Sequence, residues 1–63
     1  MAEVWPSEIL CREIFRLLVT AQDYGMSVGE SRQMVAETSG VTFSQVILIE
    51  RMGMANQWSP LSR

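Results

Sequence analysis

Apolar residues in the first third of the chain recur every three to four positions, which is the period of an amphipathic helix. Pro6 and Ser7 are typical of a helix start, and Gly25 is typical of a helix end. We therefore expect a first helix from about Pro6 or Ser7 to Tyr24. Its predicted inward residues are Leu10, Ile14, Leu17, Leu18 and Ala21.

This apolar stripe is wider than two short partner helices need. The residues that widen it are Ile9, Cys11, Phe15 and Val19. In one interpretation Ile9, Phe15 and Val19 cover Trp5 and Trp58 within a single small core, with Trp5 folding back onto it. In the other they form a dimer seam along the helix. Cys11 is expected to be a small buried filler, because no base accompanies it.

Two further helices are predicted from their start signals. Ser27 and Glu30 have the spacing of a capping box, which would begin a second helix at Val28 and end it near Ser39; Ser31 is a competing cap. Thr42 and Gln45 form another capping box, and Val41 and Val46 can close as a hydrophobic staple before and after that cap.

We expect the third helix to run from Phe43 to Met52 and to stop at Gly53. Val46, Ile49 and Met52 are predicted to face inward. The predicted outward residues are Thr42, Phe43, Ser44, Gln45, Ile47, Leu48 and Arg51. The fold class expected over residues 1–63 is a single all-α domain, a small three-helix (tri-helical) bundle with a short irregular C-terminal tail.

Val35 and Ala36 should face inward from the second helix, and Gly40 is placed where a helix ends in a left-handed residue. Ala36, Gly40, Val41, Val46 and Ile49 follow the order Ala-x-x-x-Gly-Val-x-x-x-x-Val-x-x-Ile. This order resembles that of the DNA-binding helix-turn-helix, in which close helix crossing requires alanine and a sharp turn requires glycine.

The segment Ile49-Glu50-Arg51-Met52-Gly53 resembles the end of the recognition helix in Cro/repressor-type domains. Compared with that family, the chain has an insertion between Gly25-Met26-Ser27 and Ala36, and a shorter C-terminal part. The resemblance implies a small transcriptional regulator that reads double-stranded DNA with helix 43–52, most simply as a homodimer.

The resemblance also implies a set of DNA-binding residues. Gln45 would pair with adenine and Phe43 would touch a thymine methyl group, while Arg32 and Arg51 would contact phosphates. The full predicted set is Arg32, Gln33, Thr42, Phe43, Ser44, Gln45, Leu48 and Arg51.

Charge and outward apolar residues favour a different function. Five arginines, no lysine and seven acidic residues give a net charge of −2, whereas nucleic-acid-binding domains carry a basic face. Phe43, Ile47 and Leu48 would form an exposed apolar patch, unless segment 54–61 covers it through Trp58 and Leu61. The alternative function is therefore a protein-protein interaction module, either a homodimer or a helix-binding adaptor or inhibitor, that uses the apolar faces of the first and third helices.

Other chemistries are disfavoured by composition. The chain has 63 residues, one cysteine and no histidine, so we expect no enzyme, cofactor or metal site. The carboxylates of Glu37 and Glu50 are expected to be solvated or paired with arginine. Without a basic leader or a long apolar run, we expect a cytoplasmic protein with no membrane partner.

Overall fold

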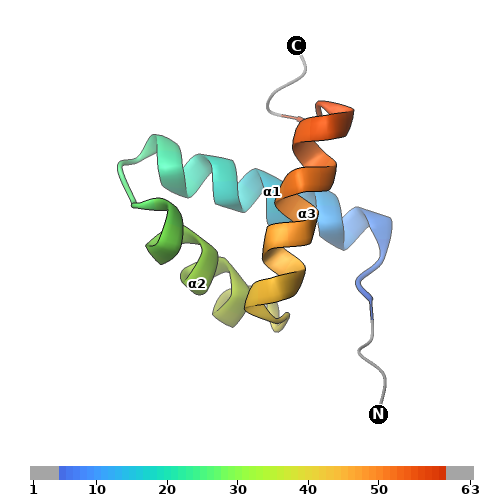
Figure 1. Cartoon of the computed structure of the whole chain (residues 1–63), viewed down its shortest axis with the longest axis horizontal. Coiled ribbons are helices and arrows are strands. Elements are labelled where there is room, and N and C mark those ends of the chain that lie inside the picture. The colour runs from blue at the N-terminus through green and yellow to red at the C-terminus, as the bar shows by residue number, and fades with distance from the viewer. Residues whose placement is uncertain (1–4, 60–63) are drawn as a thin grey trace.

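Three helices make up the fold: α1 (Glu8–Asp23), α2 (Val28–Ser39) and α3 (Phe43–Asn56). The computed structural model describes residues 5–59, and no strand occurs within that range. Each helix packs against the other two, and α3 crosses α1 (Figure 1). The predicted all-α three-helix bundle is confirmed. None of the helices over residues 5–59 is both long enough and apolar enough to cross a membrane.

Each helix begins at a hydroxyl cap. The backbone N–H of Leu10 donates to the Ser7 side chain at 3.2 Å. Ser27 and Thr42 each cap a helix as part of a full capping box, which confirms both predictions. The competing cap at Ser31 is wrong: its side chain is buried inside α2 and its hydroxyl donates to the Val28 carbonyl at 2.9 Å.

Gly40 turns the chain sharply between α2 and α3. Its backbone is left-handed, with φ 70° and ψ 29°, a conformation that costs an L side chain roughly 1–2 kcal/mol. The N–H groups of Gly40 and Val41 both donate to the Ala36 carbonyl and so complete the end of α2. The predicted left-handed glycine is confirmed, and the two helices do not continue as one rod (Figure 1).

The core lies where the three helices meet. Val46 and Ile49 are fully buried, as predicted, and so is Val35. The buried side of α1 consists of Cys11, Ile14, Phe15, Leu18 and Ala21.

The predicted inward stripe of α1 is therefore wrong at Leu10, which is 37% exposed. Its place is taken by Cys11 and Phe15 because α3 and Trp58 pack on that side of α1. Ile9 is 83% exposed and is not part of the core that contains Trp58.

Gly53 does not end α3, so the predicted stop is wrong. The helix continues to Asn56 and ends at Gln57, which adopts the left-handed conformation. A Cβ atom at position 53 would lie 2.2 Å from Cδ1 of Phe15. Glycine is needed here because α3 passes so close to α1 that no side chain fits between them.

Trp58 packs against α1 and not, within residues 5–59, over the outer side of α3. Its ring lies edge-to-face against Phe15, with centroids 6.1 Å apart, and the Arg12 guanidinium carbon lies 5.0 Å from its ring centroid. The predicted cover of Leu48 by Trp58 is therefore wrong, because Leu48 remains 47% exposed. Leu61, the other predicted covering residue, lies outside the described residues.

Candidate interaction surface

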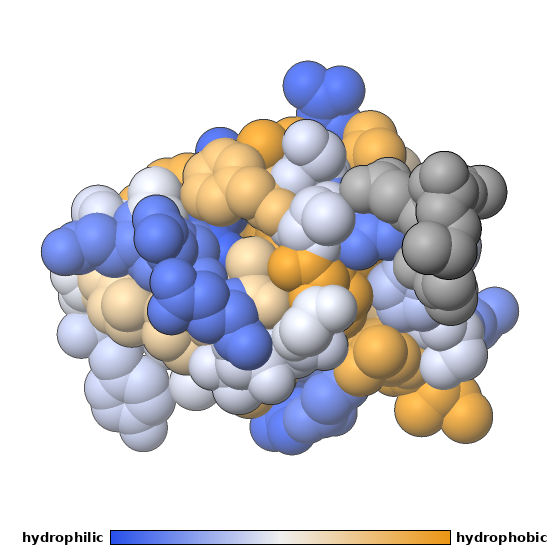
Figure 2. Space-filling model, turned by 90° about the horizontal axis from the view of Figure 1, so that it is seen from below, coloured by the Kyte–Doolittle hydropathy of each residue, from blue (hydrophilic) through white to orange (hydrophobic). Residues whose placement is uncertain are grey.

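Large apolar side chains remain exposed along the outer side of α3. Phe43 is 43% exposed, Leu48 47% and Met54 61%. Met52 is 36% exposed, so its predicted inward position is wrong. Figure 2 views the molecule from the end at which α2 meets α3 and shows apolar patches interspersed among hydrophilic side chains. The outer side of α3 therefore combines exposed apolar residues with the exposed polar residues Ser44 and Arg51.

Gln45, the predicted adenine reader, is only 4% exposed. Its side-chain oxygen accepts the N–H of Thr42 at 3.0 Å, and its own N–H donates to the Thr42 hydroxyl at 3.0 Å. The prediction that Gln45 faces outward is therefore wrong. The capping box that starts α3 turns this side chain back against the protein, so it is not presented to a base edge.

Arg32, a predicted phosphate contact, is held by Glu50 of α3. Its Nε and Nη2 atoms donate to Glu50 Oε1 at 3.0 and 2.6 Å, and the two side chains are only 28% and 15% exposed. From α1, the Gln22 amide donates to Ser31 Oγ at 3.2 Å and to Glu50 Oε2 at 3.5 Å. We call Gln22, Ser31, Arg32 and Glu50 the polar clamp, because they join all three helices. Glu50 was expected to be solvated or paired with arginine, and the pairing with arginine is confirmed; helical spacing alone does not indicate that the arginine is Arg32.

The other predicted DNA-binding residues lie on two separate elements. Gln33 is exposed on α2 and donates to Glu37 at 3.3 Å. Thr42, Ser44 and Arg51 are exposed on or beside α3, together with Phe43 and Leu48.

Most of the positive charge is already compensated. Arg12 pairs with Glu8 at 3.0 Å, and Arg16 pairs with Glu13. The hydrogen bond from Arg16 lowers the pKa of Glu13, and the same bond raises the pKa of Arg16. Over residues 5–59, Arg51 is the arginine that has no ion-pair partner. Arg12 and Arg16 lie one turn apart on α1, but each is already paired with a carboxylate.

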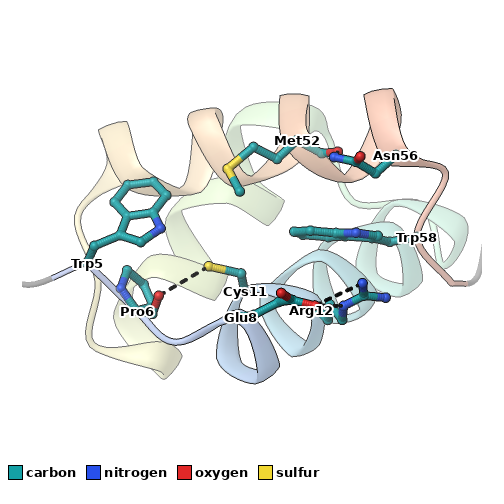
Figure 3. A pocket seen from close by; sticks show the side chains of 8 residues that line it. All are labelled: Trp5, Pro6, Glu8, Cys11, Arg12, Met52, Asn56 and Trp58. Atoms are coloured by element: carbon teal, nitrogen blue, oxygen red, sulfur yellow. Dashed lines mark hydrogen bonds and ion pairs between the residues drawn. The ribbon is translucent and has the colours of Figure 1, made fainter.

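A groove of about 420 Å³ separates the start of α1 from the C-terminal half of α3 (Figure 3). Trp5 and Trp58 stand at opposite ends of it, and α3 forms one wall with Met52 and Asn56. Trp5 is 46% exposed, so its predicted position on the core is wrong. We call this concavity the α1–α3 groove; its lining is Trp5, Pro6, Glu8, Cys11, Arg12, Met52, Asn56 and Trp58.

Cys11 lies in the floor of this groove and is 1% exposed. Its thiol donates to the Pro6 carbonyl at 3.6 Å. Burial, and then the negative charge of Glu8, raise the pKa of the thiol, which keeps it protonated and a poor nucleophile. Cys11 is buried, as predicted. No group of three metal-ligating side chains occurs among the described residues.

Comparison of the chain with protein-family models, with curated proteins and with solved structures gives no match.

Proposed function

We propose that this chain is a protein-protein interaction module that binds a partner along the outer side of α3 and in the adjoining α1–α3 groove. The observation that carries the proposal is the pair Leu48 and Met52. These two exposed apolar side chains lie one turn apart, and Met52 also forms a wall of the groove. We call Leu48 and Met52 the α3 ridge. An exposed apolar ridge beside a groove is an arrangement that can bury the apolar side chains of a partner.

The internal packing supports this proposal because it leaves the ridge unused. Leu48 is not part of the buried core. Trp58, which was expected to cover it, packs against Phe15 of α1 instead. Apolar residues that are exposed and lie together, rather than singly, are typical of an interaction surface.

DNA binding through the same helix is the second candidate. It is favoured by the left-handed turn at Gly40 and by the exposed Ser44 and Arg51 on α3. Binding of duplex DNA would weaken steeply as salt rises, and Arg51→Ala would flatten that dependence by about one charge.

The protein-binding proposal is tested by selecting helical peptides from a displayed library on the purified chain. The selected peptides are then titrated against Leu48→Glu. We expect their affinity to fall at least about ten-fold, because a charge would be buried under the partner.

Val28→Glu is the matched control, because Val28 is 48% exposed but lies at the first turn of α2, where glutamate suits the helix dipole. This variant should bind the selected peptides normally. Equal loss of affinity in both variants, or no loss in Leu48→Glu, would contradict the proposed binding surface.

A further inference from the structure

Arg51 is the single net charge on the outer side of α3. The helix contains only two charged residues, Glu50 and Arg51. Glu50 is turned toward α2, where Arg32 compensates it. Arg51 is exposed and has no such partner within residues 5–59.

The neighbours of Arg51 on the helix surface are apolar. Residues three or four positions apart on a helix lie side by side, which places Ile47, Leu48 and Ala55 around Arg51. A partner seated on Leu48 and Met52 therefore has Arg51 at the edge of its contact surface. Where the partner covers the guanidinium, burial of an unpaired charge is costly, so a partner with an acceptor of opposite charge is favoured.

The opposite rim of the α1–α3 groove does not supply that charge. Glu8 is already paired with Arg12, and Arg12 also stacks on Trp58. The remaining polar lining residue is Asn56, whose amide donates to the Met52 carbonyl at 2.8 Å. Within the groove and on the outer side of α3, the one charge left for a partner to neutralise is thus positive. The described carboxylates without an ion pair, Asp23, Glu30 and Glu37, lie on α1 and α2 and do not line the groove.

We infer that the partner is an amphipathic helix that carries a carboxylate on the edge of its apolar side, placed to pair with Arg51. This inference rests on the proposed function and specifies the chemistry of its ligand. A partner helix matches this surface because Leu48 and Met52 lie one helical turn apart. The apolar residues on one side of a partner helix recur at the same spacing. The carboxylate gives orientation and selectivity more than raw affinity.

Two synthetic peptides test the inference. They share one amphipathic helical sequence without tryptophan and differ at one position on the edge of the apolar side, which is Glu in one and Lys in the other. Trp5 and Trp58 are the only tryptophans of the chain and both line the groove, so intrinsic fluorescence reports binding directly. We expect the Glu peptide to bind about ten-fold more tightly than the Lys peptide at low salt.

Arg51→Glu should reverse this preference. Arg16→Glu, the matched charge reversal on α1, should leave it unchanged, because Arg16 lies outside the groove and the α3 ridge. Reversal in the first variant alone supports the inference.

Equal binding of both peptides that is still lost in Leu48→Glu would overturn the acidic partner but leave the proposed function standing. Binding of neither peptide would also overturn the inference. Displacement of the Glu peptide by random duplex DNA, dependent on Arg51, would show instead that Arg51 serves a phosphate.

Discussion

The two sides of α3 differ in how completely the protein uses them. On the inner side, Val46 and Ile49 are fully buried and Gly53 lies against the Phe15 ring with no space to spare. On the outer side, Leu48 and Met54 are about as apolar but are 47% and 61% exposed. Folding therefore explains the inner residues, and the outer ones need another explanation.

This difference separates stability from function along one helix. A substitution on the inner side should change the free energy of unfolding, whereas one on the outer side should change binding alone.

Gly53→Ala should have the largest effect, a loss of about 3 kcal/mol, because the new Cβ would lie 2.2–2.5 Å from Phe15 ring atoms. Gly29→Ala is the control, since a Cβ there meets nothing within 4 Å; it should stabilise α2 by about 0.5 kcal/mol. Urea unfolding of both variants measures the difference. Equal effects at the two glycines would disprove the close crossing of α1 and α3.

Glu50→Gln should cost about 2 kcal/mol, because it leaves Arg32 without its counter-charge in a partly buried site. Glu13→Gln breaks the exposed pair with Arg16 and should cost far less. Thermal unfolding of the two variants at the same pH compares the pairs. If the two losses were the same, the polar clamp would have no special role in joining the helices.

Gly40→Ala should cost about 1 kcal/mol, entirely through the strain of a left-handed backbone, because a Cβ there meets no neighbouring atom within 4 Å. Gly40→Asn should cost less, since asparagine tolerates this conformation better. Denaturant midpoints of the pair provide the measurement. An alanine variant as stable as the parent would rule out the turn assigned to Gly40.

Leu48→Glu should change the free energy of unfolding by less than about 0.5 kcal/mol, because its side chain lies outside the core. Ile49→Ala, at the neighbouring fully buried position, should cost about 3 kcal/mol. Chemical denaturation of the two variants is the test. A large loss at Leu48 would show that the ridge belongs to the core.

The local features of the fold were predictable from sequence, and the long-range ones were not. Ser27, Gly40 and Thr42 were identified because a cap or a left-handed turn involves residues within a few positions of each other. Gly53 looks like a helix stop from the local sequence, because the residue that requires glycine there, Phe15 of α1, is distant in the chain.

The candidate site was predictable only in part. Helical spacing predicts that Phe43, Leu48 and Arg51 are exposed and that this side of the helix is partly apolar. Gln45 was assigned two roles, and the capping role placed it against the protein. The Arg32–Glu50 pair joins residues on different helices, so no local spacing could reveal it.

The most direct test of the outer side of α3 as a protein-binding surface is a pair of amide-shift titrations of the isotopically labelled chain. One uses the Glu peptide and the other random duplex DNA at low salt. We expect the peptide to shift the amides of Leu48, Arg51 and Met52 and the indole signals of Trp5 and Trp58, and DNA to shift none of them. Salt-dependent shifts of Thr42, Ser44 and Arg51 with DNA, and none with the peptide, would contradict this expectation.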